Sequence, residues 1–196
     1  MLLGPEYAPL RAEFRSLPKK EIKEKCTDIL ISTGGADPIG LALRMADQIS
    51  AKCSGSTLKY HLLIGAMNRD KPEIEKMTAA NKNIELHFNV KDMRSLICSC
   101  DIAVSAAGST LYEICACGVP LITYTLADNQ IQGAEGFAKH GLALTLGDLR
   151  GSTELSSCFE LIEKLDRDHG MRAEISRKMQ SLVDGLGADR ICSCLK

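Results

Sequence analysis

Apolar runs and stretches of helical spacing alternate along most of this chain. Residues 27–33 (TDILIST) form a short apolar run that ends at Gly34 and Gly35, and residues 38–52 repeat apolar side chains every three or four positions. The alternation continues to about residue 184. We expect strands over 27–33, 58–64, 84–90, 101–106, 120–125 and 142–146, and helices over 38–52, 72–80, 92–99, 109–117, 129–140, 154–166 and 168–184.

This alternation predicts the fold class. Strands that are apolar at nearly every position are typical of a parallel sheet covered by helices on both faces. We therefore predict an α/β protein with a doubly wound, Rossmann-like parallel sheet of about six strands. The ligand of such a sheet lies at the carboxyl ends of its strands. We place this domain at residues 26–186, after a charged connector at 1–25 and before a short tail at 187–196.

Composition argues against several classes of partner. Aromatic residues make up 4% of the chain and Trp is absent, so a platform for stacking nucleic-acid bases is not expected. The net charge of −1 gives no electrostatic attraction to nucleic acid or to a membrane surface. No apolar run reaches the roughly 18 residues that a membrane helix needs. The 45% content of hydrophobic residues is ordinary for a globular protein.

The nine cysteines and four histidines do not form a recognisable metal motif. The close cysteine pairs are C-x-C rather than the C-x-x-C of zinc knuckles. Most cysteines stand in apolar segments, where a thiol behaves as a small hydrophobic group, so we expect reduced thiols and a cytoplasmic protein. We expect no metal, and we interpret all the histidines as structural or surface residues: His61, His87, His140 and His169.

A glycine turn follows the first predicted strand. The segment Thr33–Pro38 (TGGADP) leaves backbone N–H groups near Gly34 and Gly35 accessible to a diphosphate or a sugar. A simple tight turn between strand and helix explains the same residues equally well. The segment is not the G-x-G-x-x-G of dinucleotide-binding proteins, and the chain has no G-x-x-x-x-G-K-[ST] phosphate loop.

A second small-residue turn follows the strand at 101–106. Gly108, Ser109 and Thr110 open a helix there, and the free N–H groups and positive dipole end of a helix suit a phosphate. Glu113 follows one turn later, where its carboxylate can accept hydrogen bonds from a ribose diol. The alternative interpretation is that Ser109 or Thr110 only caps the helix and that Glu113 has a structural partner.

A third polar group follows the strand at 120–125. Asp128 is an ordinary N-cap residue for the next helix, whereas the amides of Asn129 and Gln130 can bind sugar hydroxyls at the same edge of the sheet. In the connector, Tyr7 and Arg11 are weaker candidates to line a cleft.

The chain resembles a known family in these segments. Residues 108–124 (GSTLYEICACGVPLITY), followed by Asp-Asn-Gln, resemble the carboxyl-terminal, UDP-sugar-binding domain of the GT-B superfamily. Residues 2–14 (LLGPEYAPLRAEF), 31–38 (ISTGGADP) and 105–113 (SAAGSTLYE) are most similar to the PseG-type UDP-trideoxysugar hydrolases and the SpsG-type spore-coat polysaccharide proteins. The MurG-type glycosyltransferases are more distantly similar.

The resemblance implies a role for each candidate residue. Glu113 would bind the ribose hydroxyls of UDP or a UDP-sugar, and the diphosphate would lie against Gly108, Ser109 and Thr110. The turn at Gly34 and Gly35 would approach the diphosphate or sugar from the other side. Asn129 and Gln130 would face the sugar, and Asn129 is the candidate catalytic residue near the reacting bond. No cofactor is implied.

One departure from the family limits the expected activity. The resembling enzymes have an amino-terminal Rossmann domain, which in the hydrolases carries a catalytic histidine, and no residue here matches that histidine. We therefore expect a partner domain in cis or in trans, and a chain that binds the nucleotide but catalyses poorly alone. A UDP-sugar hydrolase is the preferred interpretation. The alternatives are a MurG-like donor-binding domain of a transferase, a UDP-sugar 2-epimerase, or a non-catalytic nucleotide-sugar-binding module.

Overall fold

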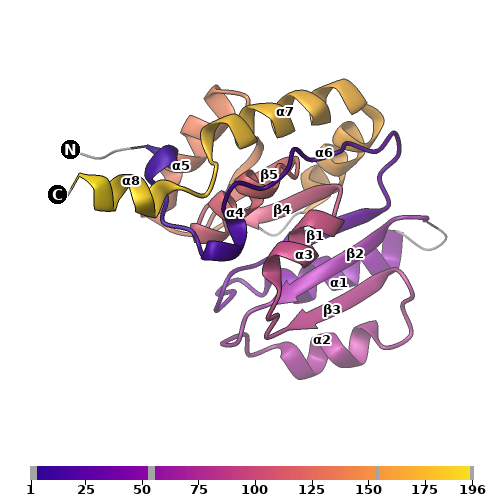
Figure 1. The fold of residues 1–196 in the computed structure, drawn as a ribbon. Coiled ribbons are helices and arrows are strands. Elements are labelled where there is room, and N and C mark those ends of the chain that lie inside the picture. The colour runs from indigo at the N-terminus through magenta and orange to yellow at the C-terminus, as the bar shows by residue number, and fades with distance from the viewer. Residues whose placement is uncertain (1–3, 53–55, 153–154, 195–196) are drawn as a thin grey trace.

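Six parallel strands form one sheet through the middle of the protein, in the order β3-β2-β1-β4-β5-β6 (Figure 1). This computed structural model describes residues 4–52, 56–152 and 155–194. The strands are β1 Asp28–Ser32, β2 Lys59–Ile64, β3 Ile84–Phe88, β4 Ile102–Ala106, β5 Leu121–Thr125 and β6 Leu144–Asp148. The predicted α/β class with a doubly wound parallel sheet is confirmed.

Helices cover both faces of this sheet. They are α1 Leu41–Lys52, α2 Lys71–Thr78, α3 Met93–Ser99, α4 Ser109–Cys117, α5 Asp128–Lys139, α6 Ser156–Arg167, α7 His169–Leu182 and α8 Gly187–Ser193. Helices α1 and α2 pack together on one face, where Lys52 of α1 also meets the Phe159 ring of α6. Helices α3, α4 and α7 form a layer on the other face (Figure 1).

The central strands carry the hydrophobic core. Every residue of β4 and β5 is buried, and so is every residue of β1 after Asp28. The edge strands β3 and β6 are mostly half-buried or exposed. Burial on both faces explains why the central strands read as continuous apolar runs in the sequence.

Two details differ from the sequence-based expectations. Pro38 lies in a turn before α1 rather than in its first turn, because Asp37 and Gly40 have φ angles of 46° and 61° and delay the helix to Leu41. The tail contains helix α8, which packs against the 3-10 turn Pro5–Tyr7 (η1). A Cβ on Gly187 would overlap the Ala8 carbonyl oxygen, so a glycine permits this close approach.

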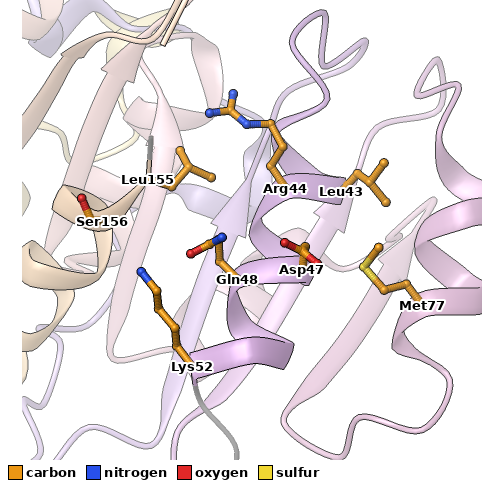
Figure 2. Close-up of a pocket in the computed structure, with 8 residues that line it drawn as sticks. All are labelled: Leu43, Arg44, Asp47, Gln48, Lys52, Met77, Leu155 and Ser156. Atoms are coloured by element: carbon orange, nitrogen blue, oxygen red, sulfur yellow. The ribbon is translucent and has the colours of Figure 1, made fainter. Parts of the chain in front are cut away.

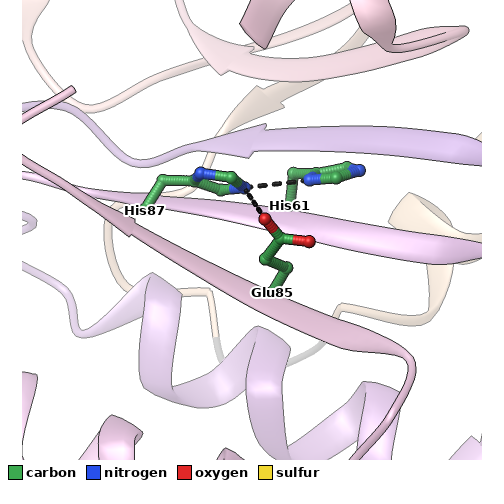
Figure 3. Close-up of side chains that lie close together, drawn as sticks. All are labelled: His61, Glu85 and His87. Atoms are coloured by element: carbon green, nitrogen blue, oxygen red, sulfur yellow. Dashed lines mark hydrogen bonds and ion pairs between the residues drawn. The ribbon is translucent and has the colours of Figure 1, made fainter. Parts of the chain in front are cut away.

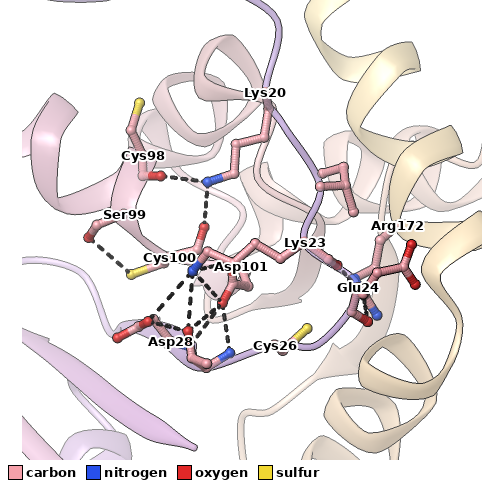
Figure 4. Close-up of polar contacts among 12 residues, drawn as sticks. Lys20, Lys23, Glu24, Cys26, Asp28, Cys98, Ser99, Cys100, Asp101 and Arg172 are labelled. Atoms are coloured by element: carbon pink, nitrogen blue, oxygen red, sulfur yellow. Dashed lines mark hydrogen bonds and ion pairs between the residues drawn. The ribbon is translucent and has the colours of Figure 1, made fainter.

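The connector crosses the outside of the α4 and α7 layer (Figure 1) and is tied down by the guanidinium of Arg172, on α7. Arg172 is 1% exposed. Its Nη1 donates to the carbonyl oxygens of Leu165 and Asp166 at 2.5 and 2.6 Å, and its Nη2 to those of Lys23 and Glu24 at 2.7 and 3.0 Å. One buried cation thus joins the connector to the end of α6 (Figure 4).

Asp101 holds the same part of the connector against the sheet. Its Oδ2 accepts hydrogen bonds from the backbone N–H groups of Thr27 and Asp28 at 2.7 and 3.1 Å and from Lys23 Nζ at 3.2 Å (Figure 4). Burial alone would raise the pKa of Asp101, but the Thr27, Lys23 and Asp28 hydrogen bonds outweigh it and leave the pKa below its ordinary value. The start of β1 is therefore fixed to the turn before β4.

Replacing Arg172 by Met tests the connector clamp. Arg172→Met leaves four carbonyl oxygens, one of them buried and three partly buried, without this donor, and we expect a loss of about 3 kcal/mol in the free energy of unfolding. Urea denaturation followed by circular dichroism measures it. Arg177→Met, at an exposed position of the same helix, is the matched control and should leave the midpoint unchanged. Equal midpoints for the two variants would contradict the clamp.

Candidate functional site

The turn after β1 presents an exposed glycine backbone. Gly34, Gly35 and Ala36 are exposed, and Gly34 has a φ of 78°. Their N–H groups donate to no residue in the described part of the chain. Asp37 closes the turn: its two carboxylate oxygens accept from the N–H groups of Leu41 and Ala42, both at 2.7 Å. Burial raises the pKa of Asp37. The turn can therefore offer N–H donors to an anion.

The loop after β2 supports this turn from the adjacent strand. Met67 N donates to the Gly35 carbonyl at 3.1 Å, and Asn68 Nδ2 donates to Asp37 Oδ2 at 3.2 Å. Gly65 lies so close that a Cβ there would overlap the carbonyl oxygens of both Gly34 and Gly35. The shape of the turn thus depends on a glycine in a neighbouring loop.

The turn after β4 leads directly into α4. Gly108 is the N-cap and no side chain caps the helix, so the interpretation of Ser109 or Thr110 as a cap is wrong. The N–H groups of Ser109 and Thr110 donate to no described residue, and Ser109 is exposed. A Cβ on Gly108 would meet nothing within 4 Å. The amino-terminal end of α4 is therefore open to an anionic group.

Glu113, one turn into α4, has a partner in the connector. Arg11 Nη2 and Nε donate to Glu113 Oε1 at 2.9 and 3.1 Å. Arg11 Nη1 also pairs with Glu13 at 3.1 Å, and its guanidinium lies 5.2 Å from the centroid of the Phe14 ring. The Glu113 side chain is 15% exposed. Arg11 thus occupies Oε1 and leaves Oε2 as the oxygen with no described hydrogen-bond donor.

The segment after β5 differs in part from the prediction. Ala127 is the N-cap of α5, and Asp128 is the first helical residue, so Asp128 is not the cap. Its carboxylate instead pairs with Arg150 at 2.8 Å. Gln130 Oε1 accepts from Leu126 N at 2.8 Å, which leaves only the Gln130 NH2 group for a ligand. Asn129 is exposed.

The three predicted turns share one edge of the sheet because β1, β4 and β5 are parallel neighbours. Tyr124 Oη donates to the Ser32 carbonyl at 2.9 Å, and Ala107 N donates to the Tyr124 carbonyl at 2.8 Å. The buried Thr125 Oγ1, at the end of β5, has no partner among the described residues. Its position made it look like an ordinary strand residue in the sequence. It is an additional hydroxyl at this edge.

Two cavities are lined by other parts of the chain. A cavity of about 720 Å³ is lined by Arg44 and Gln48 of α1 together with Leu155 and Ser156 (Figure 2). Another, of about 710 Å³, is lined by residues of α4, α5 and α7 that include Tyr112, Phe137 and Lys178. Neither is lined by a predicted site residue. The candidate site is thus an open edge of the sheet.

Two of the histidines contact each other, whereas the described cysteines are free thiols. His61 and His87, predicted as structural or surface residues, lie side by side, with His61 Nδ1 2.9 Å from His87 Nε2. The eight described cysteines are free thiols. Burial raises the pKa of Cys26 and of Cys100 to about 12, as expected for thiols that pack as apolar groups. None of the helices in the described ranges has the length and apolarity to span a membrane.

The fold and the sequence define a family. Residues 29–183 match the glycosyltransferase family 28 C-terminal domain, and the chain belongs to this family. It is 26% identical over 200 residues to the spore coat polysaccharide biosynthesis protein SpsG of Bacillus subtilis, covering 98% of this chain and 57% of SpsG. It is also 26% identical over 140 residues to a Helicobacter pylori protein named pseudaminic acid cytidylyltransferase and UDP-2,4-diacetamido-2,4,6-trideoxy-beta-L-altropyranose hydrolase, covering 71% of this chain and 24% of that protein. The chain thus spans little more than half of SpsG and about a quarter of the Helicobacter protein.

Solved structures share the fold. MurG of Acinetobacter baumannii superposes with a TM-score of 0.64 at 17% identity, over 87% of this chain and 49% of MurG. Anabaena Alr3699/HepE, solved in complex with UDP-glucose, gives a TM-score of 0.65 at 14% identity, over 86% of this chain and 48% of HepE. The predicted resemblance to GT-B carboxyl-terminal domains, and to the SpsG, pseudaminic-acid hydrolase and MurG types, is confirmed.

A glycine pair tests the support of the first turn. Gly65→Ala places a methyl group against two backbone carbonyls, so we expect a loss of about 1–3 kcal/mol in the free energy of unfolding as the turn shifts. Gly133→Ala, inside α5 where a Cβ meets nothing within 4 Å, should instead stabilise by about 0.5–1 kcal/mol. Thermal and urea unfolding measure both. A neutral Gly65→Ala would show that the turn does not depend on this approach.

Proposed function

We propose that this chain is the UDP-sugar-binding domain of a bacterial glycan-biosynthesis enzyme. The observation that carries the proposal is the arrangement on α4: Glu113 presents one free carboxylate oxygen a single turn beyond the open N–H groups of Ser109 and Thr110. A ribose diol on Glu113 would direct the attached diphosphate toward that helix end. The names of the Helicobacter relative and of the HepE structure, which mention UDP-sugars, support the same ligand class.

Each remaining residue has a role in this proposal. Gly34 and Gly35 supply backbone donors from the opposite side, and Asn129 and the NH2 group of Gln130 face the sugar. The helix end at Ser109 stabilises the negative charge that develops on the departing diphosphate. Asn129, exposed at the start of α5, is the proposed catalytic residue near the reacting bond.

The reaction needs a second domain in our proposal. The chain spans 57% of SpsG and 49% of MurG, so a further domain, in the same polypeptide or in another, would supply the acceptor side of the cleft and the catalytic acid–base groups. The similarity of residues 2–14 to the UDP-trideoxysugar hydrolases and the name of the Helicobacter relative favour water as acceptor. The whole enzyme would then be a UDP-sugar hydrolase working in the cytoplasm. A MurG-like transfer to a sugar or lipid acceptor is the second candidate, favoured by the fold likeness to MurG.

Titration calorimetry with UDP and 2′-deoxy-UDP tests the ribose contact. Wild type should bind UDP about tenfold more tightly than 2′-deoxy-UDP, because the diol donates to a charged carboxylate. Glu113→Gln should lose that difference, while Glu135→Gln, an exposed glutamate on α5, should retain it. ADP is the control for the base. Equal affinity of wild type for the two UDP analogues would contradict the assignment of Glu113.

The connector arginine gives a second prediction. Arg11 fixes Oε1 of Glu113 and aligns Oε2, so Arg11→Ala should weaken UDP binding about fivefold, in line with the loss of an orienting, half-exposed ion pair. Arg15→Ala is the matched control, because Arg15 pairs with Asp189 instead. Calorimetry of the two variants under the same salt concentration measures the difference. Tighter binding by Arg11→Ala would show that Arg11 competes with the ligand.

A further inference from the structure

A cluster of three potential metal ligands lies on β2 and β3. The parallel register pairs His61 with Glu85, and His87 is two residues further along β3 on the same face (Figure 3). One ligand atom from each of the three side chains lies within 4.8 Å of the other two. His61 is 7% exposed, and the His87 and Glu85 side chains are 17% and 44% exposed. The cluster is therefore built into the sheet and still open on one side.

The distances describe a site that is nearly assembled. His61 Nδ1 lies 2.9 Å from His87 Nε2, and His87 Nε2 lies 3.6 Å from Glu85 Oε1 (Figure 3). Two ligands of a tetrahedral zinc ion, each at about 2.0–2.1 Å from the metal, are about 3.3 Å apart. The two nitrogens need to separate by only a few tenths of an ångström to admit an ion between them.

A fourth side chain sets the orientation of His61. Asp28 Oδ1 lies 2.9 Å from His61 Nε2, and the carboxylate requires a proton on that nitrogen. In the neutral ring, Nδ1 then carries the lone pair and points at His87. A carboxylate behind a histidine in this way is the usual outer partner of a metal-bound imidazole, because it fixes the tautomer and raises the basicity of the ligating nitrogen.

The Glu85 carboxylate keeps one oxygen turned toward the two imidazoles. Lys59 is the nearby competing cation, and it pairs with Oε2 of Glu85 while Oε1 is the oxygen turned toward His87. His87 Nε2 donates to His61 Nδ1 in this arrangement, and it binds an ion when the neutral ring carries its proton on Nδ1 instead.

We propose that His61 Nδ1, His87 Nε2 and Glu85 Oε1 bind a divalent transition-metal ion of the zinc class. Two imidazoles and one carboxylate are a ligand set that Zn²⁺ accepts, and the exposed side leaves its fourth position to water. The site is distinct from the proposed nucleotide site: Asp28 begins β1 and His61 is the third residue of β2, whereas the glycine turns follow the strands' carboxyl ends. A bound ion joins edge strand β3 to β2.

The test uses the full chain, stripped with a chelator and free of any histidine tag. The exposed thiols Cys192 and Cys194 are replaced by Ser so that they do not capture the probe ion. Calorimetry with Zn²⁺ should give one ion per chain, and saturating Zn²⁺ should raise Tm. The absorption spectrum with Co²⁺ should show weak ligand-field bands without an intense thiolate charge-transfer band, because the proposed ligands carry no sulfur.

Three variants locate the ion. His87→Gln and Glu85→Gln remove ligands and should each weaken Zn²⁺ binding at least tenfold, and Asp28→Asn should weaken it about 10- to 100-fold through His61. His140→Gln is the control and should bind Zn²⁺ as the parent does. His140 is exposed at the carboxyl end of α5, which packs against β5 and β6. Glu85→Gln, at an exposed position, serves where a histidine variant fails to fold, as judged by circular dichroism.

Several outcomes would overturn the proposal. These are no heat of binding at 100-fold excess Zn²⁺ over protein, an unchanged affinity in folded Glu85→Gln, or a Co²⁺ spectrum dominated by thiolate. Equal losses for His140→Gln and His87→Gln would show scattered surface binding. None of these results bears on the binding of UDP, which is measured separately.

Discussion

The buried guanidinium of Arg172 determines where the connector lies, and the candidate site depends on that position. A cation that is 1% exposed is stable only because four carbonyl oxygens accept its hydrogen bonds. Two of these carbonyls belong to residues 23 and 24, so the connector must run over α7 before it enters β1. The same path brings Arg11, twelve residues earlier, to Glu113 on α4.

Small residues determine the surface at the carboxyl ends of the strands. The turns after β1 and β4 consist mainly of Gly, Ala and Ser, so their N–H groups remain accessible instead of being covered. Other residues hold these turns in position. Gly65 lets the loop after β2 approach the Gly34 turn closely, and the Asp37 carboxylate accepts hydrogen bonds from the first N–H groups of α1. The exposed N–H groups of these turns are thus held in place by neighbouring residues that accept or donate the other hydrogen bonds of the turn.

Two kinds of polar chemistry therefore occupy separate parts of one sheet. At the carboxyl ends, neutral backbone donors and one carboxylate form an arrangement suited to a nucleoside diphosphate sugar. Away from those ends, polar side chains satisfy one another: Asp101 binds Lys23 and the start of β1, and Asp28 binds His61, which in turn meets His87. The central strands β4 and β5, and β1 after Asp28, are buried at every position.

The sequence by itself determined the fold class and the elements of the sheet and its main helices, but not helix α8 in the tail. Local periodicity and apolar runs depend on neighbouring residues, so α4 was predicted with its observed bounds, and the strands to within a few residues. The two small-residue turns and Glu113 could also be recognised in the sequence as candidate ligand-binding residues. Tertiary structure decided what those candidates contact. Arg11 and Glu113 are 102 positions apart, and His61 meets His87 only through the register of β2 on β3. The capping role expected of Asp128 was wrong: Ala127 is the N-cap, Asp128 is the first residue of α5, and the Asp128 carboxylate pairs with Arg150 from the loop after β6. Spacing along the chain cannot reveal such pairs, because parallel strands bring together residues that belong to different periodic segments.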